Sequence, residues 1–253
     1  ARSFCTPTVL VVVPWTFGRC CLTLGMDFDS FQLAASTAAL DEEPAAREHA
    51  DLVEFRMDLA EEPLTQLSDY DGELPLLVTN RPEWEGGEGG DAGRIAALEA
   101  AVTDDAVAAV DVELASAREG GADGVIETAS EHDVRVIVST HDFEGTPPMG
   151  ELQETLRDAC TYGDVGKLAV TAETPDDVLD LLVATRAATV EGDRVATMAM
   201  GEAGRHSRAV APLYGSKIGY APVDPESATA PGQYDLTTLA DLVNRLAGDH
   251  GVA

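Results

Sequence analysis

Basic charge, and lysine above all, is what this 253-residue chain has least of. Its 16 Lys+Arg face 46 Asp+Glu, which gives a formal net charge of −30. Only two of those bases are lysines, Lys167 and Lys217. A nucleic-acid-binding protein needs a basic face to neutralise phosphates, so that class is excluded. Docking on an anionic membrane surface is disfavoured for the same reason.

Cysteine is also scarce outside the first 25 residues. Three of the four cysteines, Cys5, Cys20 and Cys21, lie in that segment, and Cys160 alone lies beyond it. No second Cys or His pair follows them at zinc-ligand spacing, so we expect no metal site. A single cysteine in the remaining chain also argues against a disulfide framework and for a reducing cytoplasm.

The first 25 residues lack acidic side chains altogether. They carry two arginines and the short apolar run VLVVV, which is too short to span a membrane. A secretory signal is one interpretation, but Pro14 interrupts the region and no clear cleavage site follows. We favour a leader outside the domain, translated upstream of a start at Met26, because the acidic composition begins abruptly there. The prediction is one domain over residues 26–253.

The acidic remainder has enough apolar residues to fold. Overall, 45% of residues are hydrophobic, which argues against intrinsic disorder. Many acids, few lysines and abundant Ala and Gly suggest a protein adapted to high salt. At ~1 M salt the Debye length is about 3 Å, so repulsion between surface carboxylates is largely screened.

Eight apolar, β-branched runs predict eight strands. They cover residues 31–37, 51–59, 74–81, 106–114, 134–143, 165–172, 194–201 and 217–223. Most are nearly continuous in apolar residues, as expected for parallel strands buried on both faces. Segments with helical spacing lie between them, including 148–163, 174–190 and 234–248, and the second opens on the cap signal Thr174-Pro175.

Alternation of strand and helix over about 220 residues favours an α/β fold of the (β/α)₈ TIM-barrel type. A doubly wound open sheet is the alternative. No glycine-rich dinucleotide or phosphate-binding fingerprint follows a strand.

Polar side chains gather where a barrel carries out its chemistry, at the carboxyl ends of the strands. Charged groups in such strands are costly unless they are paired or functional. The first examples are Glu54 and Arg56, which could form an ion pair inside the barrel, and Asp58, which we interpret as a loop or cap residue. Asp111 and Glu113 are expected to neutralise arginines. The remaining candidates at strand ends are Arg81, Glu85, His141, Lys167 and Arg208.

Lys167 stands out because it lies in a predicted buried strand. Burial next to other cations should lower the pKa of its amine. A neutral amine attacks ketones to form an imine, which acidifies the neighbouring carbon. His141 is the natural base for that proton, one strand away and with an ordinary pKa near neutrality.

Six motifs occur in order along these strands: EFRMD, NRPEWEGG, STHDFEGTP, GKLAV, GEAGRHSR…YGS and TAPGQ. This set closely resembles the type I 3-dehydroquinate dehydratase family of the shikimate pathway, over about residues 31–247. The resemblance implies a (β/α)₈ barrel that is usually dimeric, needs no metal or organic cofactor, and makes 3-dehydroshikimate through a lysine imine. The implied partners are the substrate 3-dehydroquinate and a second copy of the chain.

By motif, the resemblance makes Lys167 the imine-forming lysine, His141 the general base and Glu85 the carboxylate that orients the histidine. It also makes Arg208 the clamp on the substrate carboxylate. The other implied substrate-binding residues are Glu54, Arg56, Arg81, Thr229 and Gln233.

Two positions depart from the family pattern. Thr229 replaces a serine but keeps the hydroxyl, and Gly201 stands where many members have serine. Two other functions remain open. A class I aldolase would also use a barrel lysine imine but would break a carbon–carbon bond, and a non-catalytic barrel would not need Lys167 paired with His141 and Glu85.

Overall fold

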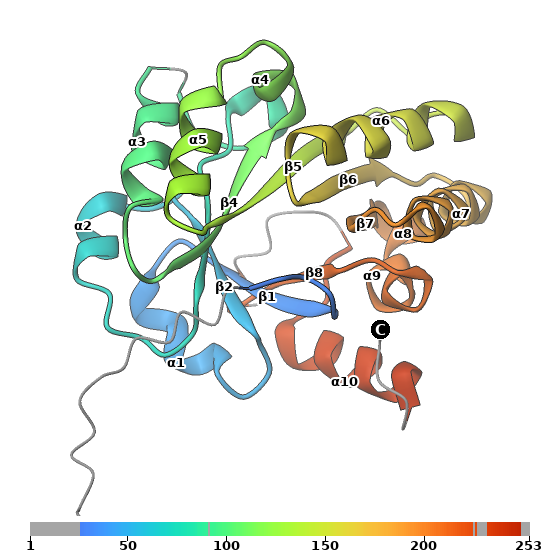
Figure 1. Ribbon diagram of the computed structural model, residues 1–253. Helices are drawn as coiled ribbons and strands as arrows, with labels where there is room; N and C mark the ends of the chain where they lie inside the picture. Colours follow the sequence, from blue (N-terminus) through green and yellow to red (C-terminus); the bar gives the residue numbers. More distant parts are fainter. Residues whose placement is uncertain (1–25, 91, 225, 227–231, 249–253) are drawn as a thin grey trace, which may run out of the picture.

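A computed structural model describes residues 26–90, 92–224, 226 and 232–248 (Figure 1). The expected leader 1–25 and Thr229 lie outside the described residues. Eight parallel strands form the centre: β1 (Gln32–Thr37), β2 (Leu52–Arg56), β3 (Leu76–Thr79), β4 (Val107–Glu113), β5 (Arg135–Asp142), β6 (Val165–Thr171), β7 (Val195–Met200) and β8 (Ile218–Pro222). Each lies within one of the eight predicted runs.

The strands follow one another around a nearly closed barrel. Their order is β7-β6-β5-β4-β3-β2-β1-β8. The two ends of this sheet meet where Val195 bridges to Ser216, and the Lys217 N–H donates to the Val195 carbonyl at 2.7 Å. The barrel prediction is confirmed and the alternative of a doubly wound open sheet is wrong.

Helices surround the strands as an outer layer (Figure 1). They are η1 (Leu40–Glu42), α1 (Glu43–Ala46), α2 (Pro63–Ser68), η2 (Glu83–Glu85), α3 (Arg94–Ala101), α4 (Leu114–Arg118), α5 (Asp123–Glu131), α6 (Met149–Tyr162), α7 (Pro175–Glu191), α8 (Gly201–Gly204), α9 (Ser207–Val210), η3 (Ala211–Tyr214) and α10 (Leu236–Ala247). The predicted cap of α7 is present as a capping box, in which Thr174 and Asp177 satisfy each other's backbone N–H groups.

The barrel interior is closed by apolar side chains at the amino ends of the strands. Leu52, Val165 and Ile218 begin their strands and belong to one buried cluster that also contains Phe28, which is fully buried. Separate clusters fill the space between strands and helices. With the amino end filled, an internal cavity is confined to the carboxyl ends of the strands.

The second strand ends earlier than predicted, and this places a site residue. The predicted run extended to residue 59, but β2 ends at Arg56. The Met57 N–H then donates to the carbonyls of Phe55 and Thr79, which turns the chain. Asp58 therefore lies in a turn, as predicted, directly after the last strand residue.

Candidate active site

A cavity at the carboxyl ends of the strands collects the candidate site residues. Among the described residues, the predicted ones that line it are Glu54, Arg56, Arg81, Glu85, His141, Lys167, Arg208 and Gln233. Thr229 lies outside the described residues. These side chains come from six parts of the chain that are far apart in sequence, and the barrel topology brings them together.

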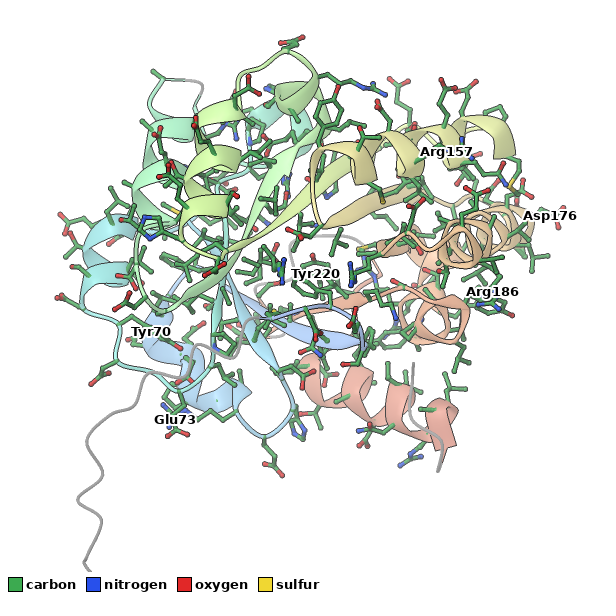
Figure 2. The ribbon with its side chains drawn as sticks, in the orientation of Figure 1. Tyr70, Glu73, Arg157, Asp176, Arg186 and Tyr220 are labelled. Atoms are coloured by element: carbon green, nitrogen blue, oxygen red, sulfur yellow. The ribbon has the colours of Figure 1, made fainter. Side chains whose placement is uncertain are left out.

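Lys167 is one of the side chains that line this cavity. It is on β6 and only 4% exposed. Its Nζ contacts Asp111 Oδ2 at 3.0 Å and lies 4.3 Å from the centre of the Tyr220 ring. Figure 2 places Tyr220 in the middle of the barrel. Both contacts were missed at the sequence level, where Asp111 was expected to serve only arginines.

Arg81 is the most heavily neutralised cation of the site. Its guanidinium contacts Asp111 Oδ1 at 2.8 Å and Glu113 Oε1 at 3.0 Å, and donates to Ser139 Oγ at 2.6 Å. Burial alone would lower the pKa of Arg81, but the two carboxylates outweigh it and raise that pKa. Glu113 also pairs with Arg94 at 2.8 Å. The prediction that Asp111 and Glu113 neutralise arginines is confirmed.

Asp111 links this network to Lys167. Burial alone would raise its pKa, but Arg81 and Lys167 outweigh burial, and the pKa of Asp111 falls below its usual value. The carboxylate is therefore ionised. It bridges a permanent cation and the lysine amine, which fixes where that amine lies in the cavity.

His141 and Glu85 form the second functional pair. His141 is the second-last residue of β5. Its Nδ1 lies 2.6 Å from Glu85 Oε2. Burial, followed by the cations Arg81 and Lys167, holds the pKa of His141 well below its usual 6.5. Burial likewise raises the pKa of Glu85 to about 7. A neutral imidazole with Nδ1 engaged leaves Nε2 as a base.

The expected ion pair between Glu54 and Arg56 is wrong. Arg56 instead forms a two-point contact with Asp58, Nε to Oδ1 at 2.9 Å and Nη2 to Oδ2 at 2.6 Å. Glu54 accepts hydrogen bonds from Ser36 Oγ at 2.5 Å and Thr79 Oγ1 at 3.1 Å. The turn after β2 explains the change of partner, because it folds Asp58 back onto Arg56. Both predicted residues still line the cavity.

Arg208 differs from every other cation of the cavity. It lies on α9 and is 5% exposed. No ion pair within the described part of the chain includes it, and its Nε has no hydrogen-bond partner there. Burial without a counter-charge lowers the pKa of Arg208 to about 10, so it stays charged at neutral pH. A buried, unpaired guanidinium is a strong site for an anion.

Gly201 occupies its position for a backbone reason. Its φ is +83°, a left-handed conformation that favours glycine, and an added Cβ would meet the Ala172 carbonyl oxygen at 3.3 Å. A serine in this backbone conformation would be strained, so glycine fits this position of the chain.

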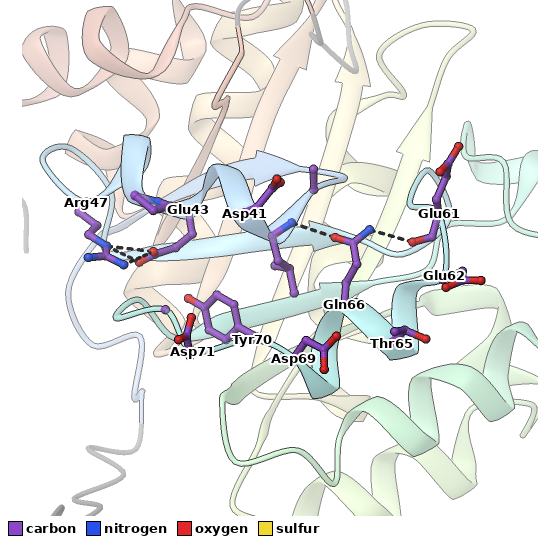
Figure 3. Close-up of a pocket in the computed structure, with 14 residues that line it drawn as sticks. Asp41, Glu43, Arg47, Glu61, Glu62, Thr65, Gln66, Asp69, Tyr70 and Asp71 are labelled. Atoms are coloured by element: carbon purple, nitrogen blue, oxygen red, sulfur yellow. Dashed lines mark hydrogen bonds and ion pairs between the residues drawn. The ribbon is translucent and has the colours of Figure 1, made fainter.

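A larger groove lies outside the barrel, and its charge sets it apart (Figure 3). It measures about 690 Å³ and runs between α1 and α2. Its acidic lining residues are Asp41, Glu43, Glu61, Glu62, Asp69 and Asp71. Arg47 is bound to Glu43 at 2.7 Å, so the groove repels anions, whereas the barrel cavity attracts them.

No described helix is long and apolar enough to cross a bilayer. No group of three or more metal-ligating side chains occurs among the residues described.

Comparison with known proteins gives consistent matches. The family model "Type I 3-dehydroquinase" matches residues 33–249. The 3-dehydroquinate dehydratase of Haloarcula marismortui is 60% identical over 228 residues, which cover 88% of this chain and 100% of that protein. The structure of 3-dehydroquinate dehydratase from Geobacillus kaustophilus has a TM-score of 0.79 at 31% identity, covering 88% of this chain and 93% of that one.

A second solved structure matches over the same barrel. The type I 3-dehydroquinate dehydratase from Clostridium difficile, with covalently modified comenic acid, has a TM-score of 0.76 at 28% identity. The match covers 86% of this chain and 92% of that chain. All of the described cavity residues lie within residues 33–249, the span of the family match.

Proposed function

Because this chain belongs to the type I 3-dehydroquinase family, we propose that it dehydrates 3-dehydroquinate to 3-dehydroshikimate through an imine on Lys167. The chain is a lyase of that family. One observation carries the proposed mechanism: the buried amine of Lys167 shares its cavity with a neutral histidine and with an arginine that has no ion pair among the described residues. These three groups are the nucleophile, base and anion anchor that the reaction needs.

The reaction begins with attack of the Lys167 amine on the substrate ketone. Attack needs a free lone pair on the Lys167 nitrogen, and His141 is the base in the same cavity that takes the proton from it. The ketone oxygen takes this proton back from His141 and leaves as water, which gives an iminium ion and restores the neutral histidine. Its positive charge draws electrons from the adjacent carbon–hydrogen bond and so acidifies that carbon.

His141 next removes the proton from that carbon. The electron pair of the broken bond moves into the imine and forms an enamine. The enamine pushes the hydroxyl off the following carbon, and protonated His141 donates to it, so that it leaves as water. Hydrolysis of the product iminium restores Lys167 and releases 3-dehydroshikimate.

The substrate is an anion, and the cavity offers it one free cation partner. Arg56 and Arg81 are each bound to carboxylates, whereas Arg208 has no ion pair within the described residues. We assign the substrate carboxylate to Arg208, whose planar fork suits two-point binding. The other substrate contacts are assigned to Glu54, Arg56, Arg81 and Gln233, which line the same cavity. The family resemblance adds Thr229, which lies outside the described residues.

Borohydride trapping tests the mechanism directly. Reduction in the presence of 3-dehydroquinate should leave a stable adduct that peptide mass mapping places on Lys167. Lys217 is the internal control, because its Nζ is bound to the Asp29 carbonyl at 2.7 Å, outside the cavity. An adduct on Lys217, or none at all, would falsify the proposal. The His141→Ala variant should still be trapped, slowly, while dehydration falls by about 10²–10⁴-fold.

The family resemblance also implies a homodimer, and we propose that a second copy binds the outer face of α7. Large apolar side chains are exposed there and on η3: Leu179, Val183, Val190, Leu213 and Tyr214. A chain with a net charge of −30 repels its copies elsewhere. The groove on this face also holds Arg186 and Glu191, the latter 3.3 Å from Arg157, so a two-fold copy can place its Glu191 against Arg186.

The variant Val183→Glu tests this surface. It should shift the chain to monomers in sedimentation velocity at high salt, because it places a charge among the exposed apolar side chains of α7. Exposed Glu73, on the opposite part of the outer layer (Figure 2), provides a control: Glu73→Gln should leave the sedimentation coefficient unchanged.

We assign the reaction to cytoplasmic biosynthesis of aromatic amino acids in a high-salt organism, as the halophilic relatives and the acidic composition support.

A further inference from the structure

Tyr220 is the least expected neighbour of the reactive lysine. It lies on β8, opposite Ala34 of β1, and points into the barrel as Ile218 does two residues earlier. Its side chain is buried and lines the same cavity as Lys167. The face of its ring lies 4.3 Å from Lys167 Nζ, which is within range of a cation–π contact.

The chemistry of the imine makes this contact more useful than an ordinary packing contact. The ammonium form of Lys167 has three N–H donors, but the iminium ion has one. Asp111 at 3.0 Å can bind that single N–H. Part of the positive charge lies on the imine carbon, which carries no hydrogen atom that could donate to a carboxylate. A ring face attracts such a charge without any hydrogen bond.

We propose that the Tyr220 ring face stabilises the iminium ion on Lys167, and so acts as a further catalytic group of this site. The inference rests on the imine mechanism proposed above. Asp111 binds the nitrogen through its N–H, and the ring supports the same cation from its π face. Together they favour the charged imine, which is the form that withdraws electrons from the substrate.

The hydroxyl of Tyr220 is not the functional part of the side chain. It is buried and has no hydrogen-bond partner among the described residues. Burial, together with the nearby carboxylates Glu54 and Asp111, raises the pKa of Tyr220 well above its usual 10, so the phenol stays neutral. The ring therefore acts on Lys167 through its π face rather than as a phenolate.

Three variants separate the ring from the hydroxyl and from packing. Tyr220→Phe keeps the ring, and Tyr220→Met fills similar space without one. Ile218→Val loosens the same buried cluster on the same strand and does not line the cavity. For each, we would measure kcat, the melting temperature, and the fraction of Lys167 trapped by borohydride at saturating 3-dehydroquinate.

The expected pattern is specific to a cation–π contact. Tyr220→Met should lower kcat and the trapped fraction by about 5- to 30-fold, the range that such a contact gives in a dry site. Tyr220→Phe should stay within about 2-fold and melt no lower than the unaltered chain, because no described residue forms a hydrogen bond with the lost hydroxyl. Ile218→Val should melt lower with kcat unchanged.

Ring-fluorinated phenylalanines at position 220 give the sharpest measurement. Fluorine withdraws charge from the ring face while shape and packing are nearly kept, so kcat should fall stepwise with each added fluorine. A flat series, or a Tyr220→Phe variant as impaired as Tyr220→Met, overturns the inference. Failure of the unaltered chain to form any adduct would instead overturn the proposed imine mechanism.

Discussion

Carboxylates on the outside of this barrel and carboxylates inside it are held in opposite ways. Outside, acidic side chains far outnumber their partners, as around the groove between α1 and α2, where Arg47 is the one basic lining residue described. Inside, Asp111 and Glu113 are fully buried, and each contacts two cations. Only the outer set depends on ions in the solvent.

This difference explains how an acidic protein can act on an anion. Residues 26–253 contain 46 acidic and 14 basic residues, a net charge of −32. Four of those bases, Arg56, Arg81, Lys167 and Arg208, line a single cavity. Paired carboxylates neutralise most of that charge, and Arg208 keeps its own. We therefore place the proposed anion site at Arg208, the one cavity cation for which the described residues supply no counter-charge.

Removing salt should have the largest effect, because it acts on the outer carboxylates and leaves the buried ones paired. At 0.1 M the Debye length is about 10 Å, so the outer carboxylates repel one another, while the buried pairs are almost unaffected. We expect loss of the whole free energy of unfolding, about 5–15 kcal/mol, on dialysis into dilute buffer. Circular dichroism and activity should fall together.

Sucrose is the control for that experiment, because it favours compact states without screening charge. It should fail to replace potassium chloride at matched osmolality. Full activity in dilute buffer would show that the outer carboxylates do not require screening.

Two of the three arginines of the cavity, Arg81 and Arg208, offer a smaller and more local test. Arg81→Met leaves Asp111 and Glu113 buried with too few cations, and should lower the free energy of unfolding by about 3–5 kcal/mol. Arg208→Met removes a cation that has no ion pair among the described residues, so its stability should change by less than about 1 kcal/mol. Urea unfolding in high salt measures both.

Arg208→Met should affect activity much more than it affects stability. Loss of a charge-assisted contact with the substrate carboxylate should raise KM by about 10- to 100-fold. Equal destabilisation by the two variants would mean that Arg208 also has a structural partner. An unchanged KM in Arg208→Met would place the substrate carboxylate elsewhere.

The sequence predicted the strands and the reactive side chains of this site better than the contacts that those side chains make. Strand ends follow from apolar runs, so Lys167 and His141 could be placed in one cavity. The contact between Lys167 and Asp111 joins residues that are 56 positions apart on two non-adjacent strands. It depends on the relative register of three strands, which apolar patterning does not determine.

Local geometry caused the other differences. Alternation along β2 put Glu54 and Arg56 on the same face and suggested that they pair, but the turn at Met57 brings Asp58 to Arg56 instead. Tyr220 was hidden in an apolar run, because its role depends on the ring facing Lys167 across the barrel. Patterning shows that such a residue is buried, but not what its ring contacts.

The smallest expected effect concerns the pair of His141 and Glu85. Glu85 is buried like the inner carboxylates, but its partner is a histidine. Burial raises the pKa of Glu85 to about 7. Below that pH the carboxyl is protonated and donates to His141 Nδ1, which moves the imidazole proton to Nε2 and removes the base. Above it, ionised Glu85 accepts the Nδ1 proton and frees Nε2. We therefore expect kcat to rise several-fold with an inflection near pH 7. In Glu85→Gln the side chain cannot ionise, so this inflection should vanish while borohydride trapping of Lys167 persists. An identical inflection in Glu85→Gln would assign the titration to another group of the cavity.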